Sequence, residues 1–172
     1  AGCWPVRGHI CPGPGRIAGG KSPGARLSPD LPGTKVVIGT GPQEAELKQR
    51  FPGTKFLGLI ENGKLAAHLA SADVFVFPSR TDTFGVVQLE ALASGTPVAA
   101  YPVTGPIDVI GSAPVGVLDN DLRVAALKAL EVPRAPCRPY AEGFSLAASA
   151  EKFQSHGTPI ARCTLLPQTP HA

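Results

Sequence analysis

Between residues 35 and 119, short apolar runs alternate with longer segments in which apolar residues recur every three or four positions. The short runs have the length of single strands and are rich in β-branched and aromatic residues, whereas the longer segments have the spacing of amphipathic helices. This alternation predicts βαβ units, whose strands lie parallel in one sheet with helices on its faces. We therefore expect an α/β protein with a doubly wound parallel sheet.

The periodicity also gives approximate bounds for the elements. We expect strands at residues 35–39, 55–60, 73–78, 97–101 and 115–119. We expect helices at residues 42–51, 62–72, 84–94, 122–130 and 144–153. Asp121 stands directly before one of these helices, where an aspartate caps free backbone N–H groups. The proline-rich stretch 131–140 is expected to be a linker.

The N-terminal part of the chain has a different composition. Residues 1–34 contain eight glycines and six prolines, a density that opposes helices and strand ladders alike. The expected organisation is an irregular glycine- and proline-rich segment at 1–14, an α/β domain that includes the C-terminal helix at 15–156 and a loose tail at 157–172.

Length, charge and motifs exclude several classes of protein. The 172 residues suit one domain of ordinary size, and no apolar run approaches the roughly 18 residues of a membrane-spanning helix. A net charge of +3 without a basic cluster argues against a nucleic-acid partner. The four cysteines form no C-x-x-C pair and the four histidines show no metal-ligand spacing. No secretory signal begins the sequence, so we expect a cytoplasmic protein.

Two carboxylates, Asp82 and Glu90, follow the apolar run at 73–78. Ligands of such sheets bind beyond the carboxyl ends of the strands, where the helices begin. If both acids belong to the helix at 84–94 or its start, they lie about 10 Å apart along its axis. Asp82 could instead be a helix cap, whereas Glu90 stands in an apolar run where an unpaired buried carboxylate would be costly.

A Gly-x-Gly pair at 39–41 stands between an expected strand and an expected helix. That is the place of a dinucleotide-binding glycine motif, but Glu44 occupies the position of its third glycine. A module that binds NAD or a flavin therefore remains an alternative, and a tight strand-to-helix turn is the preferred interpretation.

The segment 75–101, FVFPSRTDTFGVVQLEALASGTPVAAY, resembles the donor-binding helix of the retaining group 1 glycosyltransferases of the GT-B fold. The Glu-x7-Glu motif of that family stands here as Asp82-x7-Glu90, with Phe84 and Gly85 in their usual places. The likeness is strongest to mannosyltransferase-like members and extends from about Gly15 to about Ser155.

The resemblance implies a set of site residues. Glu90 would hold the ribose hydroxyls of a sugar nucleotide, and Asp82 would face the transferred hexose. The backbone of Thr83, Phe84 and Gly85 would lie against the sugar and the phosphates. Arg16 and Lys21 in GRIAGGKS would stabilise the departing diphosphate, so that no metal cofactor is needed.

The resemblance also implies what the donor and acceptor are. The donor would be GDP-mannose or a UDP-hexose, and the acceptor would be a glycan or a lipid held by an N-terminal domain that this sequence does not contain. The full-length enzyme would be cytoplasmic or peripheral at the inner membrane face. The first strand of the donor domain is expected to be degraded or missing, because Pro12 and Pro14 oppose a central strand.

Other functions stay open on the sequence. An inactive nucleotide-binding remnant of the same fold would have the same motifs, and a parallel α/β domain that mediates protein contacts would have the same periodicity.

Overall fold

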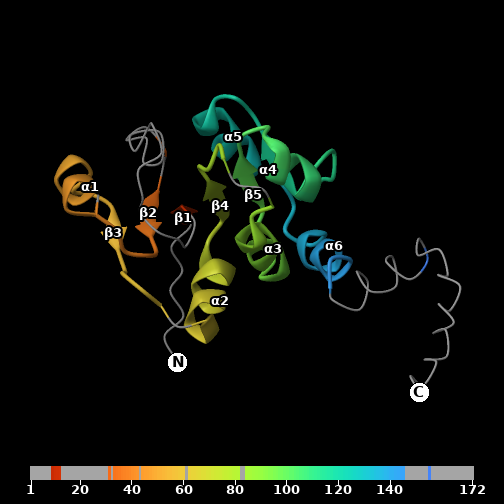
Figure 1. The fold of residues 1–172 in the computed structure, drawn as a ribbon, viewed down its shortest axis with the longest axis horizontal. Coiled ribbons are helices and arrows are strands. Elements are labelled where there is room, and N and C mark those ends of the chain that lie inside the picture. Colours follow the sequence, from red (N-terminus) through yellow and green to blue (C-terminus); the bar gives the residue numbers. More distant parts are fainter. Residues whose placement is uncertain are drawn as a thin grey trace, which may run out of the picture.

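A computed structural model of the chain describes residues 9–12, 31, 33–42, 44–60, 62–81, 84–145 and 155. Within this part, six strands form one sheet in the order β3-β2-β1-β4-β5-β6, and neighbouring strands are parallel (Figure 1). This order is that of a doubly wound sheet, in which the chain changes direction across the sheet between β1 and β4. The predicted fold class is confirmed.

All strands and helices that were expected between residues 35 and 130 are present in the expected order. The strands are β1 (His9–Pro12), β2 (Thr34–Val37), β3 (Lys55–Phe56), β4 (Val74–Phe77), β5 (Val98–Ala100) and β6 (Gly116–Leu118). The helices are α1 (Glu44–Arg50), α2 (Asn62–Ser71), α3 (Val86–Ala93), α4 (Thr104–Val109), α5 (Leu122–Ala129) and α6 (Cys137–Glu142). The helix expected at 144–153 and the tail at 157–172 lie almost wholly outside the described residues.

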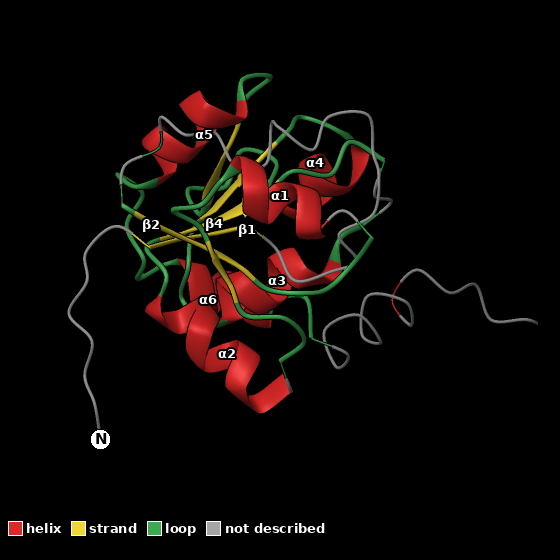
Figure 2. Cartoon of the chain, turned by 90° about the vertical axis from the view of Figure 1, so that its left-hand side faces the viewer, coloured by secondary structure: helices red, strands yellow, loops and turns green. Residues whose placement is uncertain are grey.

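Strand β4 organises the core because both of its faces are covered. All four of its residues are buried, and successive side chains of a strand point to opposite faces. Phe75 and Phe77 pack on the side of α2, α3 and α6, whereas Val74 and Val76 pack on the side of α5. Figure 2 shows these helix layers on either side of the strands. A continuous apolar run is therefore what this central position requires.

The first strand is present, contrary to the expectation that it is degraded or missing. β1 lies inside the segment 1–14 that was expected to be irregular, and it pairs with β2 on one side and β4 on the other. Pro12 is its last residue and aligns with Val76 of β4, while the register with β2 involves only His9 and Ile10. A proline at the end of a strand removes few ladder hydrogen bonds, so it is tolerated there.

Strand β3 is two residues long instead of six. Leu57 still donates to the carbonyl oxygen of Val37 over 2.9 Å, but Gly58 has φ +68° and turns the chain. Gly58 then forms an isolated antiparallel bridge with Gly39, whose N–H donates to the Gly58 oxygen over 2.7 Å. A left-handed glycine therefore ends the strand that the apolar pattern alone would extend.

Two helices lie where the sequence predicted none. α4 contains Gly105 and Pro106, and α6 occupies part of the stretch 131–140 that was expected to be a linker. In both helices the proline falls in the first turn, where its missing N–H would have no intrahelical partner. Cys137 and Ala141 of α6 are buried and join the core beside α3. Burial of small apolar residues outweighs the unfavourable propensities.

Candidate functional site at the carboxyl edge of the sheet

The loops that follow the strands gather at the carboxyl edge of the parallel sheet. The loop after β4 leads to α3, and β4 lies next to β1 at the point where the strand order reverses. In doubly wound folds this is the position at which ligands bind. The loop after β4 is therefore the first candidate for a functional site.

Gly85 begins α3 and has a conformation that other residues adopt at a cost. It is the N-cap, with φ 74° and ψ 62°, and as a glycine it provides no side-chain cap. A Cβ atom added here would lie 2.4 Å from Nε2 of Gln88 and 3.1 Å from Cζ of Phe77. The glycine that was expected from the resemblance is thus required by both backbone and space.

The N-cap of α3 is Gly85, so the alternative interpretation of Asp82 as the N-cap of this helix is wrong. The contact with a ligand that the resemblance implies for Asp82 stays a prediction, because Asp82 lies outside the described residues. The separation of about 10 Å along one helix axis, expected for Asp82 and Glu90, does not apply, since only Glu90 belongs to α3.

Glu90 lies in the middle of α3 and is exposed. No side chain in the described part of the chain forms an ion pair or hydrogen bond with its carboxylate. The expected penalty for an unpaired carboxylate in the core therefore does not arise, because the apolar neighbours Ala91 and Leu92 are buried while Glu90 is not. A solvated carboxylate near the ligand-binding edge is compatible with contact to a ligand hydroxyl.

Gln88 is a polar residue of this site that the sequence reasoning missed. It is fully buried, and its Nε2 donates to the carbonyl oxygen of Phe84 over 3.2 Å. Its Oε1 has no hydrogen-bond partner within the described residues. The side chain therefore holds the end of the loop after β4 onto α3. The signal in the sequence was an uncharged polar residue between the apolar residues Val87 and Leu89.

The other predicted site residues are divided between the described and undescribed parts of the chain. Arg16, Lys21, Asp82 and Thr83 lie outside the described residues. Phe84 is described and is 41% exposed although it is large and apolar. The structure thus places Phe84 and Gly85 at the start of α3 and Glu90 about one turn into the same helix, and the roles of the remaining four residues stay predictions.

The Gly-x-Gly pair forms a turn, as preferred. Gly39 has φ +119°, and Glu44 donates its N–H to the carbonyl oxygen of Gly41 over 3.0 Å. The side chain of Glu44 is engaged with Lys48 at 2.7 Å, one turn further along α1. Gly39 therefore serves the bridge to the loop after β3, and Glu44 serves the helix.

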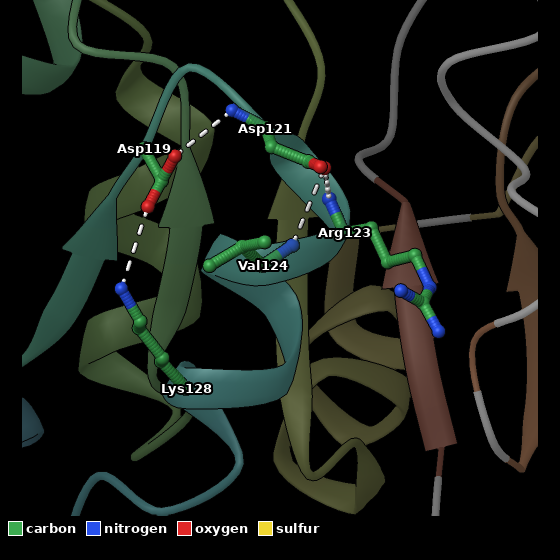
Figure 3. A network of polar contacts seen from close by, with 5 residues as sticks. All are labelled: Asp119, Asp121, Arg123, Val124 and Lys128. Carbon is green, nitrogen blue, oxygen red and sulfur yellow. Dashed lines mark hydrogen bonds and ion pairs between the residues drawn. The ribbon is translucent and has the colours of Figure 1, made fainter.

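A network of polar contacts fixes the loop after β6 (Figure 3). Asp121 caps α5 by accepting the N–H groups of Arg123 and Val124, which confirms its predicted role. Asp119 accepts the N–H of Asp121 over 2.9 Å and pairs with Lys128 at 3.5 Å. The hydrogen bond from Asp121 lowers the pKa of the Asp119 carboxyl, and Lys128 lowers it further. Both aspartates are thus occupied by the protein itself.

Two general features complete the description of the site. In the part of the chain with described coordinates, no three His, Cys, Asp or Glu side chains gather as metal ligands would. Of the helices described, none is both long and apolar enough to cross a bilayer.

Comparison with known proteins gives a consistent family relationship. The sequence profile described as "Glycosyl transferases group 1" matches residues 26–134, more than half of the chain. The chain is 41% identical over 83 residues to the sulfoquinovosyl transferase SQD2 of Arabidopsis thaliana, which covers 46% of this chain and 16% of that protein. It is 39% identical over 83 residues to a GDP-mannose-dependent alpha-mannosyltransferase of Mycolicibacterium smegmatis. This match covers 48% of the present chain and 22% of the relative. The chain therefore spans less than a quarter of the length of these relatives.

Solved structures of glycosyltransferases have a similar fold. The pneumococcal O-GlcNAc transferase GtfA, solved in complex with UDP and GlcNAc, superposes with a TM-score of 0.68 over 87% of this chain and 35% of that chain. The sequence identity of this pair is 22%, so the likeness concerns the fold.

Proposed function

The chain belongs to the group 1 glycosyl transferases, and we propose that the carboxyl edge of its sheet binds a nucleoside-diphosphate sugar as donor for retaining hexosyl transfer. The observation that carries the proposal is the start of α3. There the N-cap is a left-handed glycine, which has no side chain to cap the helix, and the exposed carboxylate of Glu90 stands one turn further on.

The start of α3 is suited to a phosphorylated ligand. The first N–H groups of a helix have no intrahelical acceptor, and the helix dipole favours a negative charge at this end. Gly85 itself has no side chain that could occupy these groups. A diphosphate could accept them, while the carboxylate of Glu90 accepts hydroxyl groups of the ribose.

The remaining roles in this proposal follow the family resemblance. Arg16 and Lys21 stabilise the charge that develops on the leaving diphosphate, and Asp82 faces the hexose, with the backbone of Thr83 alongside. Transfer in this form uses no metal ion. An acceptor glycan or lipid is held by an N-terminal domain, in keeping with the small share of each relative that this chain spans.

The donor can be either of two kinds. One relative is named for its dependence on GDP-mannose, and one structural neighbour was solved with UDP and GlcNAc. GDP-mannose and a UDP-hexose are therefore both candidates, and a mannosyltransferase is the narrower form of the proposal.

Ligand titration of the full chain tests the proposal. UDP, GDP, ADP and NAD are added separately while thermal unfolding is followed. A ligand present at 100 times its dissociation constant stabilises the folded state by about 2.7 kcal/mol. We expect UDP or GDP to raise the melting temperature. A response to NAD alone, or to none of the four, contradicts the proposal.

The alternative of an inactive remnant requires a separate measurement. A remnant would bind UDP or GDP but would not transfer sugar when joined to the acceptor domain of a relative. Radiolabelled sugar transfer by such a fusion, compared with the same fusion carrying Glu90→Ala, separates the two.

A further inference from the structure

The side chain of Arg80 lies flat against the ring of Tyr101. The guanidinium carbon is 3.6 Å from the centroid of the ring. Arg80 belongs to the loop after β4 and Tyr101 directly follows β5, and these two strands are neighbours (Figure 1). The pair therefore lies at the carboxyl edge of the sheet, and Arg80 belongs to the loop that leads to Gly85.

The ring provides a fixed support for the cation. Tyr101 is only 3% exposed and packs with Val76 and Leu122 in the core on the α5 side. Arg80 itself is exposed. Its loop is held locally, since the N–H of Thr81 donates to Oγ of Ser79 over 3.4 Å. The guanidinium of Arg80 is therefore exposed, while one of its faces rests on a buried ring.

The donors of this guanidinium are unused within the described part of the protein, whereas three of the other four described arginines use theirs. Arg50 also lies over an aromatic ring, at 5.6 Å, but its guanidinium is paired with Glu46. Arg134 donates to backbone carbonyl groups, and Arg138 pairs with Glu142. No carboxylate or carbonyl group in the described residues accepts a hydrogen bond from Arg80.

Stacking prepares an arginine for binding an anion. The ring contacts the flat face of the guanidinium, whereas the N–H groups point outward in its plane and stay available. Holding the side chain on the ring also lowers the conformational entropy that would be lost when a ligand binds. Two parallel N–H groups then match two oxygens of a phosphoryl group.

We propose that Arg80, held on Tyr101, binds phosphoryl oxygens of the nucleoside-diphosphate donor at the edge between β4 and β5. This inference rests on the proposed function and adds to it a cation that the family motif does not assign. It also gives Tyr101 a role as the positioning residue of Arg80.

Binding measurements on the full chain test the inference with four probes, UDP, GDP, pyrophosphate and the unphosphorylated nucleosides. Arg80→Gln should weaken binding of the better nucleotide at least about tenfold, because a hydrogen bond to a charged group is lost. Arg80→Lys should bind with an intermediate affinity, since it keeps the charge but not the paired donors. Arg50→Gln is the matched control, because it removes another arginine that lies over a ring, and its affinity should equal that of the wild type.

Variants of the ring test its positioning role. Tyr101→Phe keeps the face on which Arg80 lies and should keep most of the nucleotide affinity. Tyr101→Leu should lose affinity towards the level of Arg80→Gln, and melting temperatures without ligand show whether each variant is folded. Equal losses in Tyr101→Phe and Tyr101→Leu would contradict the positioning role.

The outcomes distinguish this inference from the proposed function. If the wild type binds UDP or GDP and Arg80→Gln binds equally well, Arg80 only covers Tyr101 and the inference is wrong while the proposed function stands. If the wild type binds pyrophosphate but no nucleotide, and Arg80→Gln loses that binding, the anion site is supported and the nucleotide specificity is not. If the wild type binds none of the probes, both are wrong. Nucleoside binding that is unchanged in Arg80→Gln supports a contact to phosphate.

Discussion

The guanidinium of Arg134 donates a hydrogen bond of 2.9 Å to the carbonyl oxygen of Ala72, which stands 62 positions earlier at the end of α2. The same side chain donates to the oxygens of Ala70 and Gly95 over 2.7 and 2.8 Å. It also reaches Oγ1 of Thr96 at 3.2 Å. One arginine thus binds the carbonyl ends of both α2 and α3, which have no intrahelical donors.

Replacement of Arg134 by lysine should destabilise the fold although the charge is kept. A lysine ammonium cannot reproduce the fork of donors that reaches four acceptors, so we expect a loss of about 2 kcal/mol in the free energy of unfolding. Urea unfolding measures the loss. Arg138→Lys, in the exposed pair with Glu142, is the control and should change stability by less than about 0.5 kcal/mol. Equal effects would contradict the prediction.

Three glycine-to-alanine variants separate backbone strain from steric overlap. Gly53→Ala meets nothing within 4 Å and should be neutral, while Gly95→Ala also has open space but carries φ +75°. Gly95→Ala should therefore cost about 1 kcal/mol from the left-handed backbone alone. Gly85→Ala should cost more, because its Cβ would also overlap Gln88 and Phe77. The loss in unfolding free energy should therefore be smallest for Gly53→Ala, larger for Gly95→Ala and largest for Gly85→Ala. Any other ranking would be inconsistent with this geometry.

The cap of α5 gives a local test. Asp121→Ala leaves the N–H groups of Arg123 and Val124 without their acceptor, and we expect a loss of about 1 kcal/mol. Asparagine caps helices about as well as aspartate, so Asp121→Asn should retain most of the stability. Chemical denaturation of both variants checks the prediction, and a large loss in Asp121→Asn would point to its charge instead.

The carboxyl of Asp119 should contribute a pH-dependent part of the stability. Its pKa is lowered in the folded protein, chiefly by the N–H of Asp121, so its ionised form favours folding. This stabilisation is complete above the pKa of the unfolded chain and is lost as the pH falls through the folded pKa. The difference in unfolding free energy between the wild type and Asp119→Asn should therefore be largest near neutral pH and shrink below about pH 4.

A second variant identifies the cause of that shift. Lys128→Gln removes one of the groups that lower the pKa of Asp119 but leaves the N–H of Asp121 in place, so it should reduce the pH dependence less than Asp119→Asn does. Urea unfolding from pH 3 to pH 7 gives all three profiles.

Replacement of Glu90 should affect binding and not folding. The side chain is exposed and has no partner among the described residues, so Glu90→Ala should keep the unfolding free energy within about 0.5 kcal/mol. Affinity for UDP or GDP should fall about tenfold if the carboxylate holds ribose hydroxyls. Glu142→Ala, another exposed glutamate, is the control for both measurements. Loss of stability in Glu90→Ala would indicate a structural role instead.

Most of the element order was predictable, and the errors have local causes. The predictions for β4, α5 and the cap at Asp121 are confirmed. Each depends on residues that are neighbours in the chain, and the spacing of apolar residues indicates which of them are buried. The missed helices α4 and α6 contain prolines that oppose a helix in isolation, and their burial against the rest of the fold decides in their favour.

The candidate site was predictable in part. The sequence indicated Gly85 and Glu90 through the spacing of a motif, and it placed the start of the helix at residue 84, two residues before the observed first residue Val86. Gln88 was overlooked because polar residues are usually expected at the surface, and its burial is decided by tertiary packing. Arg16, Lys21, Asp82 and Thr83 stay predictions, since they lie outside the described residues.

The sequence by itself determined the parallel α/β class, the succession of strands and helices and the family motif, because hydrophobic periodicity and short motifs are properties of neighbouring residues. The tertiary structure alone decided that β1 is a central strand despite Pro12, that Arg80 lies on Tyr101 and that Arg134 joins the ends of α2 and α3. The physical reason is that these contacts join residues far apart in the chain. Their free energy depends on which surfaces the folded sheet brings together, and no local pattern records that.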